Sequence, residues 1–147
     1  MKFWKKPLFF ALGGGTYVVL ELLWRGRSHV SMFAAGGTCF LLLGKLQKSK
    51  HRLPLAFRGL AGAGVVTLVE LGMGLLVNRD HHVWDYRKMP LQFQGQICLP
   101  FSLLWVPLSL GAMKLYELMD GKLENFTLFL KKHMKSPIFG NTAFKRR

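Results

Sequence analysis

The hydrophobic residues of this chain gather in four long blocks, and the charged residues lie between them. The blocks cover residues 7–24, 29–44, 59–77 and 97–113. A soluble domain would instead repeat its apolar positions at the period of a half-buried helix or strand. A helix needs about 20 mostly apolar residues to cross a bilayer core, with a lower limit near 17. We therefore expect an all-α integral membrane protein with four transmembrane helices. The second block is the shortest, and it spans only if Lys45 extends toward the headgroups.

The first block also resembles a signal peptide, because Lys2, Lys5 and Lys6 precede it. A signal peptide ends at a cleavage site of the A-x-A kind soon after its apolar core. Here the apolar run continues past the glycines at 13–15, and no such site follows. The pattern favours a retained transmembrane helix.

The distribution of basic residues predicts the orientation. With four spans and the N-terminus inside, 16 of the 21 Lys and Arg residues lie on the cytoplasmic side and 5 on the outer side. Cytoplasmic loops of membrane proteins carry this kind of excess, so we expect both termini in the cytoplasm. The net charge of +14 could instead indicate a nucleic-acid-binding protein, but no long basic stripe lies apart from the apolar blocks. The bilayer is therefore the expected partner, and nucleic acid is not.

The composition changes after the fourth block. This change divides the chain into a four-helix transmembrane domain, residues 1–118, and a basic cytoplasmic tail, residues 119–147. Apolar residues recur at helical spacing in the tail, with lysines beside them: Leu123, Phe126, Leu130 and Met134, next to Lys131, Lys132 and Lys135. The pattern is typical of a short amphipathic helix lying on an anionic leaflet. A solvated basic tail explains it equally well.

Two pairs of segments suggest an internal repeat. The segments 15–21 and 64–70 both run from a glycine through apolar residues to a glutamate. A G-x-x-C step then follows each of them, at 36–39 and at 95–98. The order favours two helical hairpins in the same orientation, a form of duplication that occurs in transporters.

Two acidic residues fall inside the predicted spans. A glutamate near the middle of a transmembrane helix costs roughly 2.5–3.5 kcal/mol, so Glu21 and Glu70 should face the bundle interior, approach each other and have partners. Arg25 lies four residues after Glu21, on the same helix face. Glu70 has no basic residue within a turn, and we expect Arg25 or His29 to approach it from another helix. These four residues form either a polar site for an ion, proton or substrate, or a structural contact that holds short helices together.

The long outer loop between the third and fourth blocks is expected to fold as a cap over the helix ends. Its candidate cap residues are polar or aromatic: Asn78, Trp84, Asp85, Tyr86, Gln94 and Gln96. Trp84 and Tyr86 suit the membrane interface. His81 and His82 have no third ligand at a known spacing, so we expect no metal site.

The sequence holds no pattern of catalytic residues. It lacks the G-x-S-x-G, H-E-x-x-H and Walker A motifs, so we expect no enzymatic activity and no cofactor. Any ATP hydrolysis would come from another chain. Cys39 and Cys98 lie in apolar stretches and are expected to act as packing residues.

Two stretches resemble a known family. The first is ELLWRGRSHVSM at 21–32, followed by the glycines at 36 and 37; the second is VWDY at 83–86, followed by Pro90, GQICLPFS at 95–102 and Trp105. Together they are similar to a family of small bacterial membrane proteins, the putative ATP-binding-cassette transporter permeases of type IV, over about residues 8–110. The sequence departs from the family pattern at Arg87, where Ser is usual, and at Gln92, where Asn is usual. The resemblance implies an integral protein of the bacterial cytoplasmic (inner) membrane.

Two functions follow as hypotheses. In the first, the chain is a permease subunit or channel-like transporter of a small solute or ion, working with a separate nucleotide-binding subunit or as a homo-oligomer. In the second, it is a non-transporting membrane scaffold or an envelope-associated regulatory protein, and the buried acids have structural roles.

Overall fold

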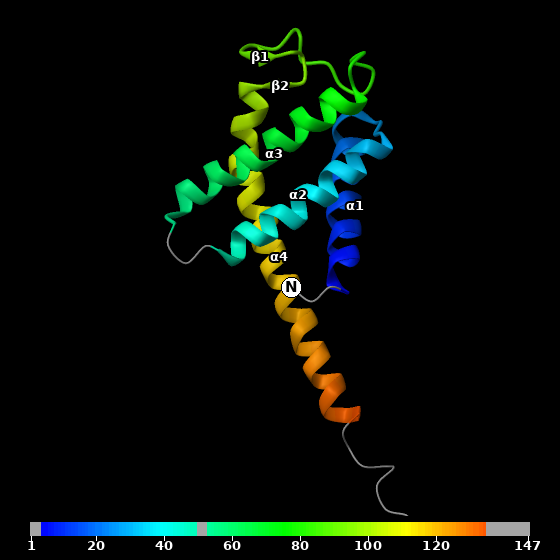
Figure 1. The fold of residues 1–147 in the computed structure, drawn as a ribbon, viewed down its shortest axis with the longest axis vertical. Coiled ribbons are helices and arrows are strands. Elements are labelled where there is room, and N and C mark those ends of the chain that lie inside the picture. Colours follow the sequence, from blue (N-terminus) through cyan, green and yellow to red (C-terminus); the bar gives the residue numbers. More distant parts are fainter. Residues whose placement is uncertain (1–3, 50–52, 135–147) are drawn as a thin grey trace, which may run out of the picture. The chain divides into compact units, whose positions relative to one another are not determined.

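Four helices and a short two-stranded ribbon make up the described part of the chain (Figure 1). The structure, a computed structural model, describes residues 4–49 and 53–134. In chain order the elements are α1 (Lys5–Arg25), α2 (Val30–Lys48), α3 (Leu55–Val77), β1 (Gln92–Phe93), β2 (Ile97–Cys98) and α4 (Leu99–Met134). The strands pair antiparallel, with Gln92 opposite Cys98 and Phe93 opposite Ile97.

All four helices are long and apolar enough to cross a membrane, which confirms the four predicted spans. α2 reaches 19 residues because the helix continues through Lys45 to Lys48, so the shortest block becomes long enough. α4 begins two residues later than the fourth block, since Ile97 and Cys98 pair as β2. Pro100 falls in its first turn, where a missing N–H is tolerated.

A tight turn joins α1 to α2. Gly26 ends α1 with φ +70°, and its N–H bonds to the Leu22 carbonyl at 2.9 Å. Glycine adopts this left-handed conformation without a Cβ penalty, which explains its use at the end of a helix. His29 caps α2, because its Nδ1 accepts the backbone N–H of Ser31 at 3.2 Å.

Glycines let α1 and α2 approach closely. A Cβ added at Gly13 or Gly36 would overlap side chains of the facing helix, Phe40 and Tyr17 respectively. A Cβ at Gly14 would meet the backbone and ring of Phe33. Lipid supplies no hydrophobic driving force between helices, so transmembrane helices associate partly through van der Waals packing. Small residues allow the close approach that this packing requires.

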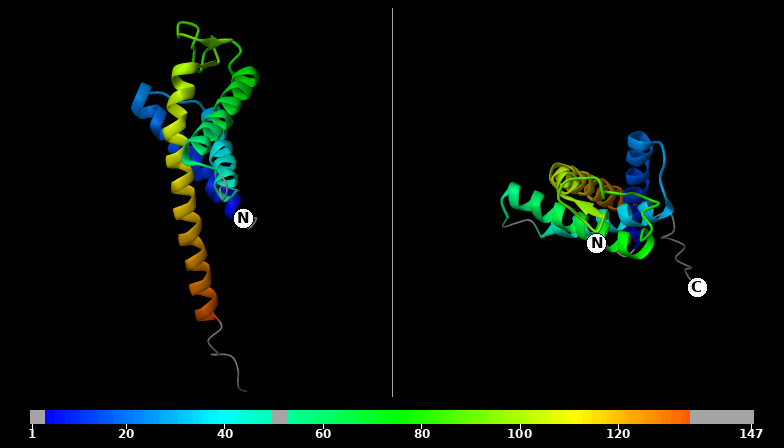
Figure 2. Two further views of the ribbon diagram at one scale, coloured as in Figure 1. Left: turned by 90° about the vertical axis from the view of Figure 1, so that its left-hand side faces the viewer. Right: turned by 90° about the horizontal axis from the view of Figure 1, so that it is seen from above.

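The packing of α3 on α4 also depends on glycine. A Cβ at Gly62 would overlap Ser109, whose hydroxyl donates to the Gly59 carbonyl at 3.3 Å. A buried cluster of Cys39, Leu43, Val66 and Met113 adjoins this contact, because a Cβ at Gly62 would also meet Met113. The two helical hairpins differ in their connections: α3 and α4 are joined by the ribbon and cap loop, whereas α1 and α2 are joined by a short turn (Figure 2). The duplication of one hairpin from the other stays a prediction.

The described residues show no separate amphipathic helix after the fourth span, so that prediction is wrong. Residues 123–134 are instead the end of α4, which continues unbroken for 36 residues. No proline follows Pro107 within α4, and a single glycine such as Gly121 costs only about 1 kcal/mol in a helix. The sequence therefore contains no signal strong enough to end α4 near residue 118. Lys135 lies outside the described residues.

The chain divides into two compact units, Met1–Glu117 and Leu118–Arg147. The first unit holds α1 to α3, the ribbon and most of the fourth span. In the second unit the ring of Phe129 lies 4.1 Å from the ring of His133, and Thr127 donates to the Leu123 carbonyl at 2.7 Å.

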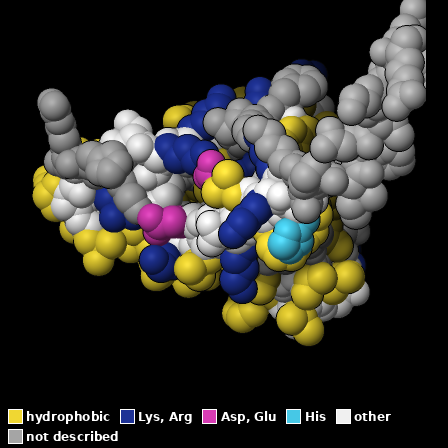
Figure 3. All heavy atoms as spheres, turned by 90° about the horizontal axis from the view of Figure 1, so that it is seen from below, with side chains coloured by type: hydrophobic (Ala, Val, Ile, Leu, Met, Phe, Trp, Pro, Cys, Tyr) yellow, Lys and Arg dark blue, Asp and Glu magenta, His cyan; other side chains and the backbone are white. Residues whose placement is uncertain are grey.

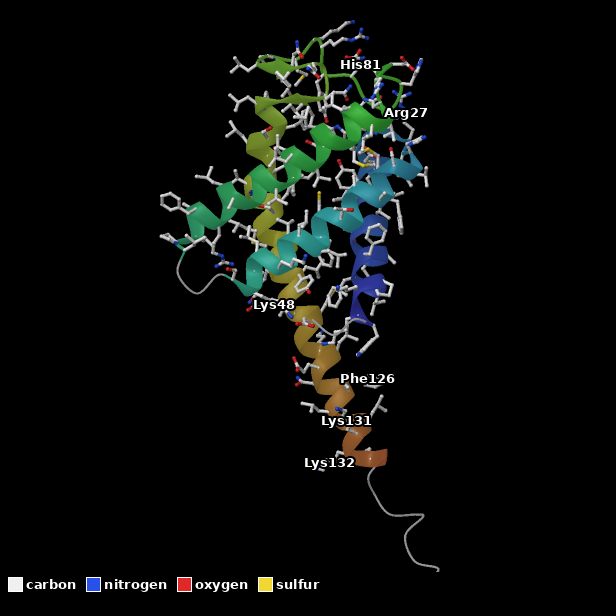
Figure 4. All side chains as sticks on the ribbon, viewed as in Figure 1. Arg27, Lys48, His81, Phe126, Lys131 and Lys132 are labelled. Atoms are coloured by element: carbon white, nitrogen blue, oxygen red, sulfur yellow. The ribbon has the colours of Figure 1, made fainter. Side chains whose placement is uncertain are left out.

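Basic side chains mark both ends of the first unit. Figure 4 labels Arg27 near the cap loop and Lys48 at the far end of α2. Lys and Arg side chains are visible on the face seen from below (Figure 3).

Candidate functional site

Glu70 lies inside α3 and is almost completely buried, with 4% of its surface exposed. The indole Nε1 of Trp105, on α4, donates to its carboxylate at 2.9 Å. The ring of Tyr17, on α1, stacks on Trp105 with 5.9 Å between ring centroids. The acid therefore lies where three helices meet. Its partner is an indole N–H rather than the Arg25 or His29 that we predicted.

Glu21 lies about one turn before the end of α1, and two residues that follow it in the sequence donate hydrogen bonds to its carboxylate. Arg25 donates to one carboxylate oxygen at 2.5 Å, and the Ser28 hydroxyl donates to the other at 2.6 Å. The first bond confirms the predicted contact four residues apart. Ser28 was not predicted, although a hydroxyl just after the turn is a plausible donor.

The two acids hold separate partners. Tyr17 is one helical turn before Glu21 on α1, and Glu21 and Arg25 line the same groove section as Tyr17 and Trp105, the donor to Glu70. The structure thus brings Glu21, Arg25 and Glu70 into one region of the bundle. The Nδ1 of His29 bonds to the hydroxyl and the backbone N–H of Ser31, and its place in the polar site stays a prediction.

Arg25 connects this region to the cap loop. Its second terminal nitrogen donates to the Val83 carbonyl at 2.7 Å. One guanidinium therefore holds both a carboxylate of its own helix and the backbone of a loop 58 residues away.

The cap loop, residues 78–96, is built around two buried amides. Asn78 and Gln96 are each 2% exposed, and the amide nitrogen of Asn78 donates to the Gln96 side-chain oxygen at 3.0 Å. The Asn78 side chain also donates to the Trp84 carbonyl and accepts the Val83 N–H. The Trp84 indole donates to the Gln96 carbonyl at 2.9 Å. These bonds join both ends of the loop to its middle.

Of the remaining predicted cap residues, Tyr86 is half-buried, whereas Asp85 and Gln94 are exposed. Tyr86 stacks on Phe101 of α4 with 5.0 Å between centroids, and burial raises the pKa of its hydroxyl. Asp85 is exposed and forms a two-point ion pair with Arg87, whose hydrogen bonds hold the pKa of the Asp85 carboxyl well below its usual range. Gln94 is exposed.

His81 is a cap residue that we did not predict. Its Nε2 bonds to the Gln94 carbonyl at 2.9 Å and lies 3.4 Å from the Gln96 amide nitrogen. Both His81 and Gln94 have positive φ, +58° and +51°, which is uncommon for residues other than glycine. No group of three His, Cys, Asp or Glu side chains suited to a metal ion occurs in the part of the chain that the structure describes.

A groove runs between α1 and α4 beside these residues. It has an inner section of about 290 Å³ and a section of about 270 Å³ at the cap end. Both sections are lined by the same four side chains: Tyr17, Leu20, Trp105 and Leu108. Glu21 and Arg25 line only the cap-end section, so the charged pair lies at one end of an otherwise apolar groove.

Residues 9–141 match the model of a family described as putative ABC-transporter type IV. The match covers most of the chain and includes both stretches that suggested the resemblance. No curated protein and no solved structure matches the chain.

Proposed function

The chain belongs to the putative ABC-transporter type IV family, and from this premise we propose that it is a permease subunit that moves a small solute or ion across the bilayer. Its polar site consists of Glu21, Arg25 and Glu70, with Tyr17 and Trp105 beside them. The chain itself is a multi-pass membrane protein. We place it in the bacterial cytoplasmic (inner) membrane, with both termini in the cytoplasm.

The burial of Glu70 carries this proposal. A carboxylate inside a span is costly, and such residues normally line a path for protons, ions or substrates. Glu70 has an indole N–H as its hydrogen-bond donor, which leaves its charge without a neutralising cation on α3 or α4 at that contact. A carboxylate in this setting suits reversible binding of a proton or a small cation.

The partners follow from what the sequence lacks. The chain has no Walker A motif, so it would require a separate nucleotide-binding subunit for ATP-driven transport. Four helices form a thin wall around a pore, which favours a homo-oligomer. We propose no catalytic activity for the chain itself.

A second candidate is a non-transporting scaffold, and the Glu21 contacts favour it. Both Glu21 oxygens have donors, from Arg25 and Ser28. A fully satisfied ion pair of this kind suits a structural role, in which it holds the end of α1 to the cap loop.

The two candidates are separated by replacing Glu70 with glutamine in reconstituted protein. Gln keeps an oxygen that accepts from Trp105, so the fold should survive, but it removes the charge. The matched control is Glu124→Gln, which changes an exposed glutamate on the same protein. Proteoliposomes of the three proteins are tested with a pH-sensitive dye inside, and then with a panel of radiolabelled ions and small solutes.

Transport predicts flux in the wild type and in Glu124→Gln, and a loss of at least about tenfold in Glu70→Gln. Equal flux in all three folded proteins would mean that Glu70 takes no part in transport. Absence of flux for every solute, with and without a co-expressed nucleotide-binding subunit, would favour the scaffold.

A further inference from the structure

The groove between α1 and α4 opens toward the side of the bundle. Its lining includes leucines that are about half exposed: Leu20 at 50%, Leu104 at 48%, Leu108 at 41% and Leu115 at 42%. All four lie on helices that are long and apolar enough to span a membrane. The groove therefore faces the hydrocarbon layer rather than an aqueous channel.

The chemistry of the lining decides what can fill the inner section. Its walls are apolar apart from a few hydroxyls, and include Gly13, Cys39, Val66 and Ala112. A cavity of about 150 Å³ lined by such side chains stays free of water and binds an apolar molecule instead. The inner section, at about 290 Å³, has room for a hydrocarbon chain. It is too small for an α-helix, whose diameter with side chains is about 10–12 Å.

The cap-end section has the character of a headgroup site. Arg25 lies in the last turn of α1, where a spanning helix reaches the headgroup layer. Trp24, Trp84 and Tyr86 also line this section, and such aromatic side chains are enriched at headgroup depth. The polar and apolar ends of the groove are therefore ordered as they are in a lipid molecule.

Arg25 also has hydrogen-bond donors that no acceptor in the described residues occupies. A guanidinium carries five N–H donors, and the described residues accept two hydrogen bonds from it, at Val83 and Glu21. Its Nε is buried and has no acceptor within the described part of the chain. Arginine pairs with phosphate oxygens through strong, charge-assisted hydrogen bonds. The Arg25 side chain is 23% exposed and lines this section, so a phosphate at the groove end could accept hydrogen bonds from its accessible N–H groups.

We propose that this groove binds one phospholipid of the surrounding bilayer, with an acyl chain between α1 and α4 and a phosphate oxygen at Arg25. The site goes beyond the proposed function, because it requires neither transport nor an ATPase partner. The bound phospholipid would fill the groove between α1 and α4.

The test measures phospholipid binding to delipidated, full-length protein in detergent by native mass spectrometry. The probes are phosphatidylglycerol and a diacylglycerol with the same acyl chains. Gly111→Phe fills the groove, because Gly111 lines the inner section and a Cβ there meets no other atom within 4 Å. Gly64→Phe is the matched control, since Gly64 is also a helical glycine with open space beside it but lines neither section.

Phosphatidylglycerol should bind one per chain to the wild type and to Gly64→Phe. Gly111→Phe should weaken binding about tenfold or more, because excluding two or three methylenes from an apolar site has that effect. Equal binding by both glycine variants would overturn the proposal. So would dimers that disappear only in Gly111→Phe, because the groove would then be an interface between two copies.

Arg25→Lys tests the headgroup. Lysine keeps a charge for Glu21 but lacks the fork of donors that matches a phosphate. Phosphatidylglycerol should bind severalfold more weakly to this variant, while diacylglycerol binding should not change. If diacylglycerol binds the wild type as tightly as phosphatidylglycerol does, the phosphate contact is wrong. This result is independent of flux through Glu70, so the failure of one proposal leaves the other standing.

Discussion

The indole nitrogen of Trp105 donates a 2.9 Å hydrogen bond to the carboxylate of Glu70 and so joins α4 to α3 inside the bundle. Trp105 also stacks on Tyr17 of α1. A single aromatic side chain therefore connects three of the four spanning helices around one buried charge.

Removing that donor should destabilise the protein. Trp105→Phe keeps an aromatic ring but loses the hydrogen bond, and a bond to a charged group is worth about 1.5–3 kcal/mol. Thermal unfolding in detergent, followed by circular dichroism, should show a clear drop in Tm. Trp24→Phe is the control, because Trp24 is 81% exposed. Equal Tm values for the two variants would mean that the indole contact does not stabilise the fold.

The cap loop should loosen when Asn78 is truncated. Asn78→Ala removes three side-chain hydrogen bonds, to Trp84, Gln96 and Val83. Each buried group left without a partner costs about 1–3 kcal/mol. Hydrogen exchange of the amides between residues 83 and 96 should accelerate. Asp80→Ala, at an exposed position of the same loop, should leave the exchange rates unchanged, and similar rates in both variants would contradict the cap network.

Neighbouring glycines of α1 should differ sharply in their tolerance of a larger residue. Gly14→Leu forces a side chain against the backbone and ring of Phe33, whereas a Cβ at Gly15 would meet no neighbouring atom within 4 Å. Overpacking costs about 1–3 kcal/mol or more. We expect Gly14→Leu to lose monodisperse protein on size-exclusion chromatography and Gly15→Leu to retain it. If both variants remain monodisperse with the same Tm, the hairpin is not closely packed there.

The basic residues predict the orientation of the chain in the membrane. The 16-to-5 asymmetry of Lys and Arg predicts that reporter fusions after Lys50 and after Lys135 report the cytoplasm. A fusion near Asp80 should report the opposite side. A cytoplasmic signal at Asp80 would reverse the assignment.

Asp85 should remain ionised in acid that protonates an ordinary aspartate. Its folded pKa is depressed by hydrogen bonds from Arg87, whereas an unperturbed Asp has a pKa of about 3.9. The pairing is therefore complete above the unfolded pKa and is lost as the pH falls through the lower folded value. Carbon-13 NMR titration of the side-chain carboxyl should show this, and Arg87→Ala should return the pKa toward its usual range. An unchanged titration in Arg87→Ala would mean that another group lowers it.

Features that depend on local sequence could be predicted. Block length alone predicts the four spans, because a bilayer of fixed thickness requires helices of a minimum length. The Glu21–Arg25 pair follows from a spacing of four residues on one helix. Both inferences need no knowledge of how the helices pack.

Features that depend on packing could not be predicted. The partner of Glu70 was expected to be basic, but the structure supplies an indole from a helix 35 residues away. That contact depends on how α4 packs on α3, which the local sequence does not specify. The length of α4 was missed for a different reason, because a change in polarity near residue 118 is not a helix-breaking signal.

The bond between Arg25 and the Val83 carbonyl has a consequence for the order of assembly during synthesis. α1 and α2 emerge from the ribosome first, and Glu21 on the same helix already neutralises Arg25 as the hairpin enters the membrane. The acceptor at Val83 arrives only after α3 has been made, and Gln96, which holds the cap together, arrives later still. The first hairpin is thus inserted with the charge of Arg25 already paired with Glu21 but without the hydrogen bond from Arg25 to Val83. That bond forms only after the C-terminal half of the chain has been made.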